Sequence, residues 1–235
     1  MTAVELLGPV RAFGANPGPG PQQAAFAMLA SKAGQVVKVE ELAAGAPVSR
    51  VRTHIAGLRR VLRQAGLDAK SILASTGDGY VLRVEPDQTD SWQFDKLHRR
   101  GVATLAVGDH SAAADVLASA LALWRGEALT GVPGTFAAWE RDRLTERRLT
   151  ATENLIRARM RLTEPAELVP ELAHLVESNP HRDSLRELLM VALVRSGRRA
   201  EALLVLRDSA RKPGPQLLRI QERILADDEA FFEAS

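Results

Sequence analysis

The stretch VSRVRTHIAGLRRVLRQAGL, from Val48 to Leu67, decides how the rest of the chain is interpreted. Four apolar residues in it are separated by four, three and four positions: Val51, Ile55, Leu58 and Leu62. This is the spacing of one buried stripe on an α-helix. The other face carries arginines and no acidic residue. Such a face can hold phosphates, but it is also found on ordinary solvent-exposed helices, so the neighbouring segments must decide between the two interpretations.

The flanking segments predict a winged helix-turn-helix. The residues from Val4 to Phe13 are expected to start a strand or hairpin, and 14–21 is a loop rich in glycine and proline. Helices are predicted over 22–34 and, more briefly, 39–44. After the basic helix, residues 70–86 have β-branched and aromatic residues around Thr76-Gly77-Asp78-Gly79, which indicates a hairpin. Three helices followed by a hairpin form the outline of this fold.

Nearly everything after residue 89 has helical periodicity. Asp90 or Ser91 is a plausible N-cap for the first of these helices. Further helices are predicted over 111–124, 136–162, 166–177, 184–196, 200–210 and 216–225. The segments 98–124 and 185–211 each run helix, glycine turn and alanine-rich helix, as in tetratricopeptide repeats. We therefore expect a mainly α fold, with a winged helix-turn-helix (α/β) domain at 1–87 and an all-α tetratricopeptide-like domain at 92–230.

Composition narrows the classes of function. The 235 residues are 46% hydrophobic and 26% charged, which is ordinary for a soluble protein. The net charge is only +2, so contact with nucleic acid requires a local basic patch. The chain has no cysteine, which excludes disulfides and thiolate metal sites and fits an intracellular protein. Without a signal peptide or an apolar run of about 20 residues, a cytoplasmic protein with no membrane contact is expected.

Several motifs resemble those of one known family. The sequence VRTHIAGLRRVL looks like the recognition helix of OmpR-type winged-helix domains, and GYVLRVEPDQTDSWQFDKL resembles the wing and junction of the Streptomyces antibiotic regulatory proteins. The motifs LALWRGEAL, ERDRLTERRL and PGPQLLRIQERIL agree with that family's bacterial transcriptional activator domain. The resemblance covers almost the whole chain, with the C-terminal motifs the more specific part. It implies sequence-specific DNA binding and activation of biosynthetic gene clusters.

The chain also departs from the family pattern, as a shortened and divergent member would. Gly57 and Ala56 stand where relatives have arginine, and Thr76 stands where the wing usually has one, with the acidic Asp78 nearby. The loop between the second and third helices, which touches RNA polymerase in relatives, is cut to Gly45-Ala46-Pro47. Each lost base contact removes about 1–3 kcal/mol of the roughly 4–10 kcal/mol that separates specific from non-specific binding. Phosphate contacts position a protein on DNA without specifying sequence.

The candidate DNA-contacting residues lie in the basic helix and the wing. They are Arg50, Arg52, Thr53, His54, Arg59, Arg60, Arg63 and Thr76. Most of these contacts are expected to go to phosphate. The question that the sequence leaves open is whether DNA reading survives the loss of arginine at positions 57 and 76.

No other motif predicts a chemical site. The five histidines show no metal-ligand spacing, no nucleophile motif indicates an enzyme, and we expect neither a metal nor a cofactor. Glu140, Asp142 and Glu146 alternate with arginines and are interpreted as solvated ion pairs on one helix. Trp124 and Trp139 are expected to anchor the core at helix junctions, although the segment 124–139 could instead line a groove for a partner.

Two hypotheses follow. The first is a DNA-binding transcriptional regulator, an activator of a secondary-metabolite gene cluster, whose partner is double-stranded promoter DNA. The second is a degenerate winged-helix scaffold that acts by binding a protein or small molecule instead of reading DNA. RNA polymerase, a protein bound through the helical domain, and a second copy of the chain are open as further partners.

Overall fold

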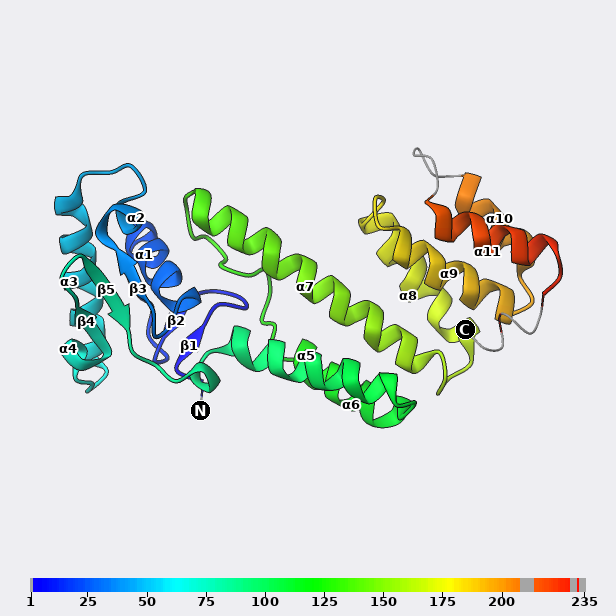
Figure 1. Cartoon of the computed structure of the whole chain (residues 1–235), viewed down its shortest axis with the longest axis horizontal. Helices are drawn as coiled ribbons and strands as arrows, with labels where there is room; N and C mark the ends of the chain where they lie inside the picture. Colours follow the sequence, from blue (N-terminus) through cyan, green and yellow to red (C-terminus); the bar gives the residue numbers. More distant parts are fainter. Residues whose placement is uncertain (1, 208–213, 229–231, 233–235) are drawn as a thin grey trace. The chain divides into compact units, whose positions relative to one another are not determined.

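The computed structural model describes residues 2–207, 214–228 and 232. They divide into two compact units. The first unit contains the residues up to Arg100 together with Ala118–Thr150, and the second contains Gly101–Leu117 together with the residues from Ala151 onward. All described strands belong to the N-terminal part of the chain, and the rest is helical (Figure 1). The mainly α fold with an N-terminal winged helix-turn-helix is therefore confirmed.

A short antiparallel pair, β1 (Val4–Glu5) and β2 (Arg11–Ala12), opens the first unit. It is held from far along the chain by Asp90, the first residue of α5 (Asp90–Ala106). The Leu6 and Leu7 N–H groups donate to the Asp90 carboxylate at 2.8 and 3.0 Å, and Arg125 Nη2 donates to it at 3.0 Å. Burial raises the pKa of Asp90, against the opposing effect of these hydrogen bonds. The residue expected as an N-cap thus anchors the N-terminal hairpin.

The winged helix-turn-helix follows. Its helices are α1 (Gly20–Ser31), α2 (Val39–Ala43), α3 (Val48–Gln64) and the single turn α4 (Ala69–Ile72). Its strands β3 (Val36–Lys38), β4 (Leu73–Ser75) and β5 (Gly79–Leu82) form an antiparallel sheet in the order β3-β5-β4. The strand β3 and the turn α4 were not predicted from the sequence. At Gly79 a Cβ would lie 2.2 Å from the Val37 carbonyl oxygen, so the close approach of β5 to β3 requires glycine.

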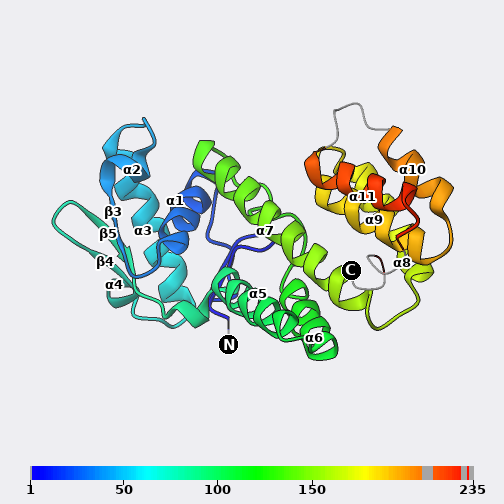
Figure 2. The same ribbon diagram turned by 45° about the vertical axis from the view of Figure 1, so that its right-hand side comes forward.

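The turn between α2 and α3 is as short as the sequence predicts. Ala44 adopts a left-handed conformation with φ 46°, and Gly45 follows with φ 86°. Side chains from α1, α3, β4 and β5 fill the core of the first unit, including Phe26, Leu29, Ile55, Leu58, Leu62, Leu73 and Leu82. In Figure 2 the loop between β4 and β5 extends away from the helices.

The remainder of the first unit comes from η1 (Pro86–Gln88) and parts of α5, α6 (His110–Leu121) and α7 (Thr135–Arg159). Trp124 is buried and meets Phe94 edge-on at 5.5 Å between ring centres, so its expected role in the core is confirmed. Trp139 is 61% exposed, and the same expectation was wrong for it. The interpretation of Glu140 as solvated was also wrong, because it is buried and accepts from Arg143 Nε at 2.7 Å and Nη2 at 2.6 Å.

The second unit is built from paired helices. The helix α9 (Asp183–Arg195) packs against α8 (Pro165–Ser178), α10 (Arg199–Arg207) and α11 (Pro215–Leu225). In the α5–α6 pair a Cβ on Gly101 would lie 2.5 Å from Leu117 Cγ, so a small residue permits the close helix contact that the repeat pattern predicts. The predicted helix 200–210 is observed to 207, and its last residues lie outside the described part of the chain. No helix in that part has the length and apolar character that membrane crossing requires.

Candidate nucleic-acid interface

The helix α3 has one buried and one exposed face. Its predicted stripe of Val51, Ile55, Leu58 and Leu62 is at most 2% exposed and packs into the core of the first unit. Truncating one of these side chains to alanine typically costs about 2–5 kcal/mol, so the stripe holds the helix firmly. The opposite face is therefore presented to solvent on a rigid support.

Three arginines stand on the exposed face. Arg52, Arg60 and Arg63 are all exposed. The side chains of Arg52 and Arg60 form no hydrogen bond or ion pair with any residue that the structure describes, and Arg63 Nε donates at 3.3 Å to the Arg59 carbonyl oxygen. The helix contains no carboxylate that would compete for these cations. Such a face can bind phosphates without first breaking a salt bridge.

Arg59 differs from its neighbours because its guanidinium is already engaged. Nε and Nη2 donate to the Leu73 carbonyl oxygen at 3.0 and 2.7 Å, and Nη2 donates to Ser75 Oγ at 3.0 Å. The guanidinium carbon also lies 5.9 Å from the centre of the Tyr80 ring. The arginine thus ties α3 to both strands of the wing. Arg59 was predicted from the sequence to contact phosphate, and its partners Ser75 and Tyr80 were not predicted.

Three further predicted residues lie near the start of α3. Thr53 is exposed, and its hydroxyl donates to the Ser49 carbonyl oxygen at 3.3 Å. Arg50 is exposed and His54 is half-buried, and both line a cavity beside α1 and α2. These two side chains therefore lie on a different side of the helix from Arg60.

Gly57 is half-buried and faces the Gln22 side chain of α1. A Cβ built there would lie 2.0 Å from Gln22 Oε1 and 2.7 Å from Gln22 Cδ, because the Gln22 side chain lies across this part of α3. Gln22 is held in turn by donating from Nε2 to the Pro17 carbonyl oxygen. A larger residue at position 57 would have to displace Gln22. The position that resembled a base-reading site is therefore directed at α1.

The wing presents few groups that could contact DNA. The Thr76 N–H donates to the Gly79 carbonyl oxygen at 2.9 Å, which closes the three-residue turn. The Thr76 hydroxyl oxygen is buried and has no hydrogen-bond partner among the described residues. Asp78 is exposed in the same turn and adds a negative charge. The predicted contact from Thr76 would require the turn to rearrange.

The described ranges contain no cluster of three or more histidine and carboxylate side chains that could hold a metal ion.

Comparisons with known proteins agree with this architecture. Residues 89–225 match the model of the bacterial transcriptional activator domain. The chain is 36% identical over 244 residues to the regulatory protein AfsR of Streptomyces griseus, covering 95% of this chain and 24% of that protein. It is 32% identical to the regulatory protein DnrI of Streptomyces peucetius, covering 86% of this chain and 83% of that protein.

A similar fold occurs in a solved structure, Mycobacterium tuberculosis EmbR in complex with a low-affinity phosphopeptide. The TM-score is 0.87 at 27% sequence identity, and the match covers 95% of this chain and 65% of that one. The chain thus spans only about a quarter of AfsR and just under two thirds of the EmbR chain.

Proposed function

The chain belongs to the family of the bacterial transcriptional activator domain, and we propose from this membership that it is a transcriptional regulator that binds double-stranded DNA. The regulated target in this proposal is a biosynthetic gene cluster, which the chain activates. Residues 1–87 form an OmpR-type DNA-binding domain, and residues 92–230 form the activator domain. In this proposal the regulator also contacts RNA polymerase and a second copy of the chain.

The observation that carries the proposal is the exposed face of α3. Arg52, Arg60 and Arg63 are exposed on a helix without acidic residues, and its other face is fixed in the core. Each phosphate that these cations neutralise releases condensed counterions from DNA. Three such contacts give a salt slope of about −2.7, since each contributes about −0.9.

The side chains on this face that could contact base edges, apart from the arginines, are small. Thr53 and Ala56 are exposed between the arginines. A threonine hydroxyl or a methyl group can contact base edges, including the thymine methyl, but neither gives the bidentate contact of an arginine to guanine. We therefore expect modest sequence discrimination and a large electrostatic contribution to affinity.

Fluorescence anisotropy with labelled duplex DNA tests the proposal. The probe is the upstream region of the biosynthetic genes adjoining this protein's own gene, with a scrambled duplex of equal length as reference. The triple variant Arg52→Gln/Arg60→Gln/Arg63→Gln should lose at least 100-fold in affinity at low salt and most of the salt slope.

The matched control is Arg11→Gln/Arg99→Gln/Arg219→Gln. It removes an equal number of positive charges, three, from exposed positions that have no ion pair among the described residues. The control should retain nearly wild-type affinity. Equal losses in both triple variants would show that net charge alone drives binding, and the proposal would then be wrong.

One observation favours the alternative of a winged-helix scaffold. The Thr76 hydroxyl is buried and the exposed Asp78 places a carboxylate at the wing turn, where DNA phosphates would be repelled. If the wild-type protein shows no DNA binding at low salt and co-elutes with a full-length regulator of the same family in size-exclusion chromatography, the scaffold function replaces the DNA-binding one.

A further inference from the structure

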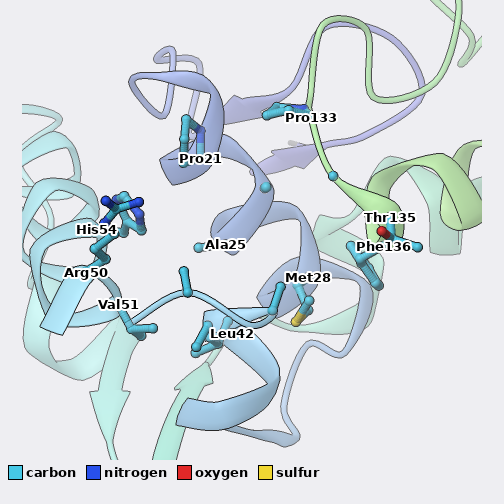
Figure 3. A pocket seen from close by; sticks show the side chains of 15 residues that line it. Pro21, Ala25, Met28, Leu42, Arg50, Val51, His54, Pro133, Thr135 and Phe136 are labelled. Atoms are coloured by element: carbon cyan, nitrogen blue, oxygen red, sulfur yellow. The ribbon is translucent and has the colours of Figure 1, made fainter. Parts of the chain in front are cut away.

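A cavity of about 500 Å³ lies in the first unit, bordered by α1, the turn between α2 and α3, the start of α3, and residues 133–136. Its walls are mostly apolar and include Ala25, Met28, Leu42, Val51, Pro133 and Phe136. Figure 3 shows these side chains arranged around the open space. The cavity is open to solvent on one side, and its size and lining are those of ligand pockets, which have about 300–1,000 Å³ and mostly apolar walls.

Two cationic or protonatable groups stand on one side of this cavity. Arg50 and His54 are one helical turn apart on α3, and Figure 3 shows their side chains together, across the cavity from Thr135 and Phe136. Neither side chain makes a hydrogen bond or an ion pair within the part of the chain that the structure describes. No residue lining the cavity carries a carboxylate. The lining thus joins an apolar interior to an uncompensated positive edge.

The apolar walls and the Arg50 guanidinium together determine which kind of ligand the cavity can bind. A ligand with an apolar ring system or chain would cover the apolar walls, and each Å² of apolar surface buried in this way contributes about 25 cal/mol to the free energy of binding. One anionic group on that ligand can accept charge-assisted hydrogen bonds from the Arg50 guanidinium, and a carboxylate or sulfonate matches its planar fork. A cationic ligand would face Arg50 without a counter-charge.

We propose that this cavity binds a small, largely apolar molecule that carries one anionic group. Arg50 and His54 are also candidate DNA-contacting residues at the start of α3. An occupant that neutralises Arg50 therefore lowers the affinity of the protein for DNA. This second part rests on the proposed function, whereas binding to the cavity does not.

Decanoate is a suitable probe, used below its micelle-forming concentration with the full-length protein. Binding is measured by isothermal titration calorimetry and by two-dimensional ¹H–¹⁵N NMR. We expect saturable binding with shifts concentrated in α1, the α2–α3 turn and the start of α3. Decanol, which has the same chain without the charge, should bind at least several-fold more weakly.

Two pairs of variants test where the probe binds. Arg50→Gln should weaken decanoate binding about tenfold or more, whereas Arg52→Gln, which removes the same charge outside the cavity, should leave it unchanged. Ala46→Leu, at the half-buried position of the turn, fills space in the cavity and should also weaken binding, while Ala138→Leu at an exposed position of α7 should not. Equal affinity for decanoate and decanol, or no difference within both pairs, would overturn the cavity proposal.

The same samples test the coupling to DNA. Saturating decanoate should reduce the affinity of the wild-type protein for duplex DNA several-fold and should have little effect on Arg50→Gln. Unchanged DNA affinity at saturation would overturn the coupling. If the protein bound no DNA at all, the proposed function would fail while the decanoate titration would still decide the cavity proposal.

Discussion

Arg59 and Arg60 are adjacent arginines on α3, and the structure gives them different tasks. Arg59 donates three hydrogen bonds to the wing, two to the Leu73 carbonyl oxygen and one to Ser75 Oγ. The Arg60 side chain is exposed and makes no hydrogen bond or ion pair within the described ranges. We predict that Arg59→Ala lowers stability and that Arg60→Ala lowers DNA affinity without changing stability.

The expected size of the stability loss follows from the contacts. A hydrogen bond that involves a charged group contributes about 1.5–3 kcal/mol, and the three bonds of Arg59 share one guanidinium, so their contributions do not add. Because Arg59 is only half-buried, a total near 2 kcal/mol is reasonable. For a chain of this length, 1 kcal/mol shifts Tm by about 2–4 °C, so Arg59→Ala should lower Tm by about 4–8 °C.

Thermal unfolding followed by circular dichroism gives the first measurement, and DNA anisotropy across a series of salt concentrations gives the second. Arg60→Ala should keep the wild-type Tm within about 1 °C, since substitutions at exposed positions usually change stability by less than about 0.5 kcal/mol. It should lower the salt slope by about 0.9, the value for one phosphate contact. Arg59→Lys is an informative third variant, because a lysine keeps the charge but cannot form the forked contact to Leu73.

The reasoning is refuted if Arg59→Ala melts at the wild-type temperature, or if the two alanine variants lose the same salt slope with unchanged Tm. Either result would mean that Arg59 leaves the wing in solution and acts as another phosphate ligand. A wild-type Tm for Arg59→Lys combined with a low Tm for Arg59→Ala would assign the stabilisation to charge instead of geometry.

Three further predictions concern stability. Asp90→Ala should lower the free energy of unfolding by about 3–5 kcal/mol in urea titrations, because it leaves the buried Leu6 and Leu7 N–H groups without their acceptor. A loss below about 1 kcal/mol would contradict the anchoring of the hairpin by Asp90. Ala44→Gly should raise Tm by a few degrees, since it relieves about 1–2 kcal/mol of left-handed backbone strain, and an unchanged or lower Tm would contradict that strain. Burial lowers the pKa of His98 below its ordinary value of 6.5, so as the pH falls the unfolded chain binds a proton at this residue before the folded protein does. The free energy of unfolding should therefore fall as the pH drops through 6.5. His98→Gln should flatten this pH dependence, and an identical pH profile in the variant would exclude His98 as its source.

The sequence was sufficient to predict the winged helix because its signals are local. The stripe from Val51 to Leu62 repeats with the helical period, and the hairpin has the turn residues that the geometry requires. The strand β3 was missed for an equally local reason. It has three residues and one buried side chain, Val37, and α2 begins at the next residue, so neither length nor alternation distinguishes it.

The directions of individual side chains could not be predicted. Arg59 and Arg60 are equivalent in composition, and only the position of the wing decides that one is engaged. The same holds for Gly57, whose orientation toward Gln22 depends on how α1 crosses α3. Likewise, Trp124 is buried and Trp139 is exposed, because burial of an aromatic residue depends on which neighbours reach it. The spacing of apolar residues predicts which face of a helix is buried, but it does not predict which residues of other elements each side chain contacts.

The anchoring of the N-terminal hairpin by Asp90 has a consequence for biosynthesis. The N–H group of Leu6 leaves the ribosome 84 residues ahead of its carboxylate acceptor, and Arg125 follows another 35 residues later. During translation the first strands therefore stay hydrated and unpaired with Asp90 until more than a third of the 235 residues has emerged. Contacts between such distant residues slow folding because a long loop must close first. For the same reason, a nascent chain arrested before residue 90 should expose its N-terminal segment to proteases, and protection should appear only after Asp90 and Arg125 have been synthesised.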